Sequence, residues 1–261
     1  MRGSNIVAVM PFDGVECIFL RGMRYECILS AISKNCLLIA RTERTLYEMN
    51  RRALKVEAPR YISQINFSKL RHKLDSFFDG SRLPNEFSVG TLNEAAEVAK
   101  FDENSSPWDN SNTFMPWIRR MNTDLTHGFG RWRDQELVRE HSSTGSAYVF
   151  PTPSNVIASL TKMFAVMDNI DSMLMRSVFV FVCIVFLHPF TDGNGRLART
   201  VMNCMLRRYF AQPYVPIKEI TEHVWGGYVI RMRLAGVFNE WDDIIKFFCH
   251  VFTSVAGLDP T

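Results

Sequence analysis

The spacing of apolar residues indicates a chain built mainly from helices. In Lys69–Phe78 apolar side chains recur three or four residues apart, and the segment closes at Asp79-Gly80. This pattern is typical of an amphipathic helix with a defined end. Ser154 is a suitable N-cap for another helix, because its hydroxyl can accept a bond from the first turn. The same reading predicts helices over 117–125, 154–167, 197–210, 222–238 and 241–255.

Two segments instead predict β-hairpins. Ile6–Met10 and Glu16–Leu20 flank the turn-forming residues 11–14, and His141–Pro153 has a strand that ends at proline. Between them, the polar, turn-rich segment 102–112 reads as a loop and as the preferred domain boundary. We therefore divide the chain into a mainly helical N-terminal extension of unknown role, residues 1–103, and a second domain, residues 113–255. The extension is interpreted as packing on that domain rather than as a separate target-recognition module.

Composition narrows the classes of function. The chain has 261 residues, 47% of them hydrophobic, and 30 Lys and Arg against 27 Asp and Glu give a net charge of only +3. This balance is ordinary for a soluble protein and a poor footprint for nucleic-acid binding. The most apolar run, Val178–Leu187, is about half the length of a membrane-spanning helix. We expect no nucleic-acid partner and no membrane partner.

Cysteine usage and the first residues bear on the compartment. The six cysteines form no CxxC pair and no zinc-like spacing, so a reducing compartment is the simpler interpretation. The first residues lack the features of a secretory signal. We expect a cytoplasmic protein, and secretion as an effector by a machine that reads unstructured signals stays open.

The segment Thr191-Asp-Gly-Asn-Gly-Arg196 carries the candidate chemistry. It reads as a turn that leads into a helix, and the N–H groups at a helix start bind anions such as phosphate. Arg196 and Arg199 lie three residues apart, on one face of that helix, where each can fork onto phosphate oxygens. The segment predicts a phosphate cradle.

Two further side chains turn this cradle into a candidate active site. Asp192 offers a hard oxygen ligand for a magnesium ion that bridges substrate phosphates. His188, just before the turn, is placed to take a proton from an attacking hydroxyl. Each feature alone is more often structural, but their occurrence together within twelve residues favours phosphoryl or nucleotidyl transfer.

The segment His188–Arg199 resembles the Fic-domain family. It matches every fixed position of the family signature HPFx(D/E)GNGRxxR, and the likeness extends over roughly residues 113–255. Gly130-Arg-Trp-Arg133 is similar to the family's G-x-(Y/F)-R stretch, at a looser level, and 241–248 to a closing helix. The resemblance implies a mainly α fold, a Fic-type helical bundle with a small β-hairpin flap. It therefore predicts a helix over Ser177–Leu187, against the local β propensity.

The resemblance also implies an activity and its residues. Relatives use ATP and Mg²⁺ to attach AMP to a Ser, Thr or Tyr of a target protein, with His188 as general base and Asp192 as metal ligand. Phe190 would anchor the loop in the core. The implied ATP- and phosphate-binding residues are Gly193, Asn194, Gly195, Arg196, Arg199 and, in the base pocket, Tyr228. The implied target-binding flap, which aligns the target by strand-like pairing, is Tyr148, Val149 and Phe150.

Many Fic proteins restrain themselves with a helix bearing (S/T)xxxE(G/N), whose Glu pairs with the second arginine of the signature. Thr45–Glu48 and Thr91–Glu94 are each one residue short of this spacing, and the C-terminal segment 254–259 has no Glu. We therefore expect no internal inhibitor, and expect either no restraint or a separate inhibitory, antitoxin-like protein. Removal of AMP, known in relatives with that Glu, is disfavoured for the same reason.

Other functions remain open at this point. Relatives that transfer UMP, GMP or phosphocholine keep the same loop, whereas those that phosphorylate carry Ala and Lys where this chain has Gly193 and Gly195. A rival of a different class is a non-catalytic interaction protein with a vestigial site. It is disfavoured because His188, Asp192 and both arginines are retained.

Overall fold

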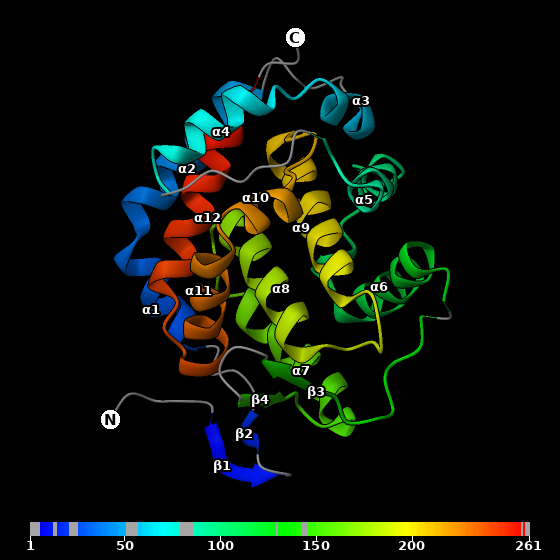
Figure 1. The fold of residues 1–261 in the computed structure, drawn as a ribbon. Coiled ribbons are helices and arrows are strands. Elements are labelled where there is room, and N and C mark those ends of the chain that lie inside the picture. Colours follow the sequence, from blue (N-terminus) through cyan, green and yellow to red (C-terminus); the bar gives the residue numbers. More distant parts are fainter. Residues whose placement is uncertain are drawn as a thin grey trace.

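The computed structural model describes residues 6–12, 15–20, 26–50, 57–78, 86–128, 130–141, 146–256 and 258. In this part of the chain, helices dominate and a small sheet lies at one end (Figure 1). The helices are α1 (Glu26–Lys34), α2 (Cys36–Asn50), α3 (Ala58–Ser63), α4 (Phe67–Asp75), α5 (Val89–Ala99), the 3-10 helix η1 (Pro107–Asp109), α6 (Ser111–Thr126), α7 (Pro153–Met167), α8 (Met173–Leu187), α9 (Asn194–Phe210), α10 (Ile217–His223), α11 (Trp225–Phe238) and α12 (Asp242–Val255). The strands are β1 (Ile6–Phe12), β2 (Val15–Leu20), β3 (Val138–His141) and β4 (Ser146–Val149).

Helix α8 forms the centre of the molecule. Its N-cap is Ser172, whose side chain accepts a hydrogen bond from the Met175 N–H, and residues 178–184 are buried with at most 2% exposure. Its β-branched and aromatic side chains would suit a strand, but a helix that is apolar on all sides is stable when neighbours cover every face. Helices α7, α9 and α11 contact it, so tertiary packing overrides local propensity here.

The N-terminal helices pack on the same core as the rest of the chain. Helices α1, α2 and α4 contact α12, and α5 contacts α9, so segments far apart in sequence lie side by side (Figure 1). One hydrophobic cluster joins buried residues of both regions, for example Leu46 with Phe252 at 0% exposure each. The packing places α5 directly against the helix that carries the two signature arginines.

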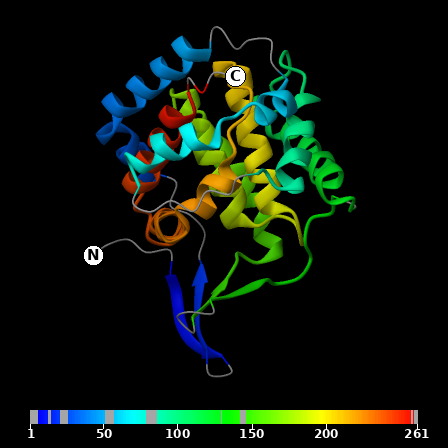
Figure 2. The same cartoon turned by 45° about the horizontal axis from the view of Figure 1, so that its top comes forward.

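The four strands form one sheet in the order β1-β2-β4-β3. Strands β3 and β4 are an antiparallel hairpin, and β2 pairs in parallel with the other edge of β4. Figure 2 shows β1 and β2, in dark blue, extending away from the helices. Both hairpins expected from the sequence are therefore present, and the mainly α fold with a hairpin flap is confirmed.

Several predicted boundaries shift in the structure. The helix expected from Ser154 begins at Pro153 with Thr152 as N-cap, because proline is well suited to a first helical position. Residue 222 belongs to the separate short helix α10, which the apolar spacing did not reveal. Among the described residues, no helix is long and apolar enough to span a membrane.

Candidate active site

His188 terminates helix α8 and faces the turn that follows. It is the C-cap residue, with the left-handed values φ 48 and ψ 59, and its N–H still donates to the Ile184 carbonyl. Its Nδ1 lies 3.4 Å from the Val185 carbonyl oxygen, so a proton on Nδ1 would face an acceptor and leave Nε2 as the basic nitrogen. The side chain is half-buried, which permits contact with a substrate.

Arg133 holds the backbone around His188 in place. Its Nε donates to the His188 carbonyl at 2.7 Å, and its Nη2 donates to the Pro151 carbonyl and, at 3.5 Å, to that of Leu187. Burial lowers the pKa of Arg133, and the charge of Glu136 opposes this in part. A cation at the carbonyl end of α8 also complements the helix dipole. The sequence match at Gly130–Arg133 pointed to this segment but not to this role.

Phe150 connects the flap with the candidate base. It follows β4 directly, its N–H donates to the Leu137 carbonyl, and its ring centroid lies 4.4 Å from that of His188. The backbone of Tyr148 and Val149 is paired on both sides, with β3 and with β2. A target strand therefore finds no open edge on β4 in this arrangement; within the described sheet, the outer edge of β3 is the one beside the flap that no strand covers.

The turn between α8 and α9 is closed by its own side chains. The Phe190 ring is buried at 1% exposure and stacks on Trp132, with centroids 4.9 Å apart. Asn194 Oδ1 accepts from the Phe190 N–H at 2.9 Å, and its Nδ2 donates to the Phe190 carbonyl at 2.6 Å. The Asn194 amide therefore shapes the cradle, and only its backbone N–H, in the first turn of α9, is placed for an anion.

The two glycines of the turn serve different ends. Gly193 has φ 81, and a Cβ there would lie 2.3 Å from Thr126 Cγ2 and 2.8 Å from Asn122 Nδ2, so the fold itself requires glycine. A Cβ at Gly195 would make only an ordinary 3.5 Å contact with Arg199 Nη1. The fold itself therefore does not require glycine at position 195. The absence of a side chain there leaves room for a ligand to approach the backbone closely.

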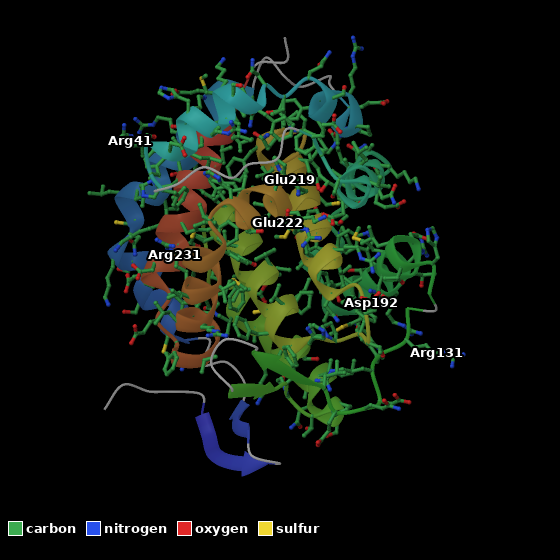
Figure 3. All side chains as sticks on the ribbon, in the orientation of Figure 1. Arg41, Arg131, Asp192, Glu219, Glu222 and Arg231 are labelled. Atoms are coloured by element: carbon green, nitrogen blue, oxygen red, sulfur yellow. The ribbon has the colours of Figure 1, made fainter. Side chains whose placement is uncertain are left out.

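Asp192 and Arg196 pair with each other at the mouth of the cradle. Arg196 Nη2 donates to Asp192 Oδ2 at 2.8 Å, while Nη1 donates to the Leu125 carbonyl. The Asp192 side chain is 80% exposed, and Figure 3 labels it on the turn that precedes α9. A lone exposed carboxylate fits Mg²⁺, which keeps several waters and takes one or two carboxylates together with substrate phosphates. No cluster of three or more metal-binding side chains occurs within the described ranges.

Arg199 is held by a carboxylate that the sequence did not single out. Its Nε donates to Glu94 Oε2 at 3.0 Å and its Nη2 to Glu94 Oε1 at 2.5 Å, and Glu94 is 1% exposed. Burial disfavours the charged form of Arg199, but the bond and charge of Glu94 outweigh this, with Tyr214 and Tyr228 adding to them, and raise the pKa of Arg199. The expectation that no internal glutamate meets the second signature arginine is therefore wrong.

The one-residue difference in spacing explains why Glu94 was missed. The motif asks for Ser or Thr four residues before the Glu and for Gly or Asn after it, whereas this chain has Gly90 and Ala95 there. What brings Glu94 to Arg199 is the packing of α5 against α9, which a linear pattern does not encode. Tyr214 supports the pair, because its hydroxyl donates to Glu94 Oε2 at 3.3 Å.

Tyr228 lies on α11, half-buried, with its ring 5.7 Å from that of Phe247. Tyr228 contributes, after Glu94 and Tyr214, to the raised pKa of Arg199. A role in binding the nucleotide base stays a prediction.

Comparisons with known proteins agree on one family. Residues 115–206 match the Fic/DOC family model. A search of the curated proteins found no match. Among solved structures, a Fic family protein from Desulfovibrio desulfuricans G20 superposes with a TM-score of 0.51 at 16% identity, covering 88% of this chain and 73% of that one. Fic-1 from C. elegans gives 0.51 at 19% identity, covering 87% and 71%.

A Fic-domain signaling protein from Bacteroides thetaiotaomicron VPI-5482 also superposes with a TM-score of 0.51, at 16% identity, covering 82% of this chain and 94% of that one. At these identities the superpositions concern the fold alone. Proteins of the matched family are generally AMP transferases or related transferases. The signature residues, the family model over residues 115–206 and the shared fold together support a Fic/DOC domain in this part of the chain.

Proposed function

We propose that the protein transfers AMP from ATP to a Ser, Thr or Tyr hydroxyl of a target protein. The observation that carries this proposal is the closed turn between α8 and α9. It holds the half-buried His188 at one end and the N-terminus of α9 at the other, and the Asn194 amide fixes the distance between them. A general base next to an anion-binding helix end is what nucleotidyl transfer needs.

In the proposed reaction, the target hydroxyl oxygen attacks the α-phosphorus of ATP. The new oxygen–phosphorus bond forms as the bond to the β-phosphate oxygen breaks, and pyrophosphate leaves. His188 Nε2 takes the hydroxyl proton. The backbone N–H groups at the start of α9, with Arg196 and Arg199, hold the phosphates in position, so that placement and charge stabilisation supply most of the rate.

Asp192 would hold Mg²⁺ at this site. When bound, the ion neutralises charge on the phosphates. Because Asp192 is already bonded to Arg196, ion and nucleotide must compete with that pair. Both side chains are partly or largely exposed, at 35% for Arg196 and 80% for Asp192, so breaking their bond costs little.

We further propose that the protein is restrained by its own Glu94. While Arg199 donates Nε and Nη2 to Glu94, that edge of its guanidinium cannot fork onto a γ-phosphate. A phosphate held by the remaining N–H groups would lie close to the negative charge of Glu94, which disfavours it. The pair is nearly buried, so water screens it weakly. With an internal restraint of this kind, a separate inhibitory protein is no longer needed to explain how the activity is controlled. Removal of AMP was disfavoured because no inhibitory Glu was expected, and Glu94 removes that objection.

The flap supports docking of an extended target segment. Because β4 is covered by β2 on one side and β3 on the other, we place the target strand along the outer edge of β3, Val138–His141. Strand addition to an exposed edge gives affinity through main-chain bonds. This revises the docking edge expected at residues 148–150.

The experiment is labelling of a proteome with α-labelled and, separately, γ-labelled ATP in the presence of Mg²⁺. The Glu94→Gly variant serves as the active form, and the same variant with His188→Ala as the control. We expect transfer of the α-label only, lost in the control. Transfer of the γ-label, or label that survives His188→Ala, would contradict AMP transfer with this base.

Labelled UTP, GTP and CDP-choline distinguish the other family chemistries, since preferred transfer from one of them replaces AMP by that group. Incubation of an AMP-modified target with the wild-type protein tests the reverse reaction. A protein that binds no nucleotide in any of these forms would favour a non-catalytic interaction role.

A further inference from the structure

A second buried carboxylate holds the helix that carries Glu94. Glu219, on α10, is 1% exposed, and its Oε1 accepts from Thr91 Oγ1 at 2.6 Å and from the Ser88 N–H at 3.3 Å. Ser88 is the N-cap of α5 and Thr91 lies in its first turn. Thr91 precedes Glu94 by three residues, so both point to the same face of the helix.

The neighbouring residue of α10 strengthens this contact. Lys218 Nζ donates to Ser88 Oγ at 2.8 Å, and Ser88 Oγ in turn accepts from the Thr91 N–H at 3.2 Å. Two consecutive residues of α10 therefore clamp the first turn of α5. Figure 3 labels Glu219 on this helix, next to the exposed Glu222.

Helix α10 is itself fixed to the helix that carries Arg199. The Asn203 side chain on α9 accepts from the Val215 N–H at 2.6 Å and donates to the Val215 carbonyl at 3.1 Å, two residues before α10 begins. The same Asn203 amide donates to the Arg199 carbonyl at 3.0 Å. Through α10, the first turn of α5 is thus tied to the backbone of Arg199.

We propose that Glu219 is a positioning residue of the inhibitory contact, which it sets through Thr91 and α5 rather than by touching Arg199. The closed arrangement carries a cost, because Glu219 Oε2 is buried without a hydrogen bond among the described residues. Movement of α5 away from α10 would let water reach that oxygen. The two hydrogen bonds to Glu219 Oε1, from Thr91 and Ser88, therefore hold α5 against α10, and the unsatisfied Glu219 Oε2 favours their separation.

This inference rests on the proposed function, and its test uses three single variants in the full chain. Glu219→Ala removes the acceptor, Glu219→Gln keeps an oxygen in its place, and Glu222→Ala is a matched control on the same short helix. We expect Glu219→Ala to raise AMP transfer about tenfold, as for loss of a hydrogen bond to a charged group. Glu219→Gln and Glu222→Ala should stay near the wild-type rate.

A double variant tests whether Glu219 acts through Glu94. In the Glu94→Gly background, Glu219→Ala should leave the rate unchanged, because the contact it positions is already gone. A further change of several-fold in that background would overturn the proposal, as would a Glu219→Ala rate equal to that of the wild type. Thr91→Val, which removes the hydroxyl donor at nearly constant volume, replaces Glu219→Ala if the latter fails to fold.

Amide hydrogen exchange separates this proposal from the proposed chemistry. Exchange across 89–99 should speed up in Glu219→Ala and Thr91→Val, and stay slow in Glu222→Ala and Thr91→Ser. If no variant transfers any nucleotide, the proposed function fails while this readout still decides the role of Glu219. Unchanged exchange in both disruptive variants would show that Glu219 does not hold α5.

Discussion

The Glu94 carboxylate and the Arg199 guanidinium form a two-pronged ion pair that joins α5 to α9, with N–O distances of 3.0 and 2.5 Å. Glu94 is 1% exposed and Arg199 18% exposed, so water and salt reach the pair poorly. The second arginine of the signature is thereby occupied by the protein itself.

Replacing Glu94 should raise the proposed transfer activity. We expect Glu94→Gly to raise AMP transfer by roughly 10- to 100-fold, because hydrogen bonds to charged groups are each worth about 1.5–3 kcal/mol and about 1.4 kcal/mol is tenfold. Initial rates with α-labelled ATP measure the effect. Asn93→Ala, at the exposed neighbouring position, is the control and should leave the rate unchanged. An unaltered rate in Glu94→Gly would show that the ion pair does not restrain transfer.

The two glycines of the cradle should respond differently to alanine. Gly193→Ala introduces a Cβ that overlaps Thr126 at positive φ and should lower the free energy of unfolding by about 1–3 kcal/mol. Gly195→Ala meets only Arg199 Nη1 at 3.5 Å, so stability should be kept. The added methyl should instead weaken nucleotide binding, because it stands where a phosphate approaches the backbone. Denaturant unfolding measures the stability of both variants, and calorimetric titration with Mg-ATP measures their nucleotide affinity. If Gly195→Ala binds Mg-ATP as tightly as the wild type, the phosphates do not approach the backbone at residue 195.

Arg133 should affect catalysis more than binding. Arg133→Gln removes the bonds to the His188, Leu187 and Pro151 carbonyls, and should lower the free energy of unfolding by about 2 kcal/mol. With His188 less well placed, kcat should fall while the KM for ATP changes little. Arg131→Gln, two residues away at an exposed position, is the matched control. If kcat is intact in a folded Arg133→Gln, the backbone contacts do not position the base.

Acidification should destabilise the fold through two histidines. Burial lowers the pKa of His223 by more than Asp75 raises it, and the charge of Arg71 lowers it further. The pKa of His250 is lowered by burial and, to a smaller extent, by the charge of Arg231. Folded-state values below the unfolded value of about 6.5 mean that the unfolded chain binds protons first as pH falls. The stabilisation is therefore present above about pH 6.5 and is lost as pH drops below it.

The measurement is the Tm between about pH 7.5 and pH 5, which should fall. His250→Phe keeps the stacking on Phe77, where the ring centroids lie 4.3 Å apart, and should reduce the slope. His72→Gln, at an exposed position, should leave the slope as it is. If His250→Phe leaves the slope of Tm against pH unchanged, His250 does not contribute to the loss of stability in acid.

Loss of His188 should separate binding from chemistry. We expect His188→Ala to lower kcat by roughly 10²- to 10⁴-fold, the usual contribution of a positioned base. Affinity for Mg-ATP should change little, because the cradle is built by α9 and the turn before it. A comparable loss of affinity would indicate that the variant has disturbed the turn, which thermal unfolding would reveal.

Much of the candidate site was predictable because it is contiguous in the chain. His188, Asp192, the turn glycines, Arg196 and Arg199 lie within twelve residues, so the covalent chain itself brings the proposed base, the proposed metal ligand and the phosphate cradle together. Helices α4, α6, α7, α9, α11 and α12 followed from the sequence pattern, with displaced ends, whereas the short helix α10 did not. Helix α8 followed only from the family resemblance, because an all-apolar segment has no periodicity by which to distinguish helix from strand.

The sequence by itself determined which atoms are candidates for the proposed chemistry, since the signature is local. The tertiary structure decided whether those atoms are available. Glu94 and Arg199 are 105 residues apart in the sequence, and Thr91 and Glu219 are 128 apart. Strand β2, near the N-terminus, pairs with the distant strand β4. Such contacts depend on how whole helices and strands pack against one another, and the short pattern around each residue carries no information about the surface that will lie opposite it.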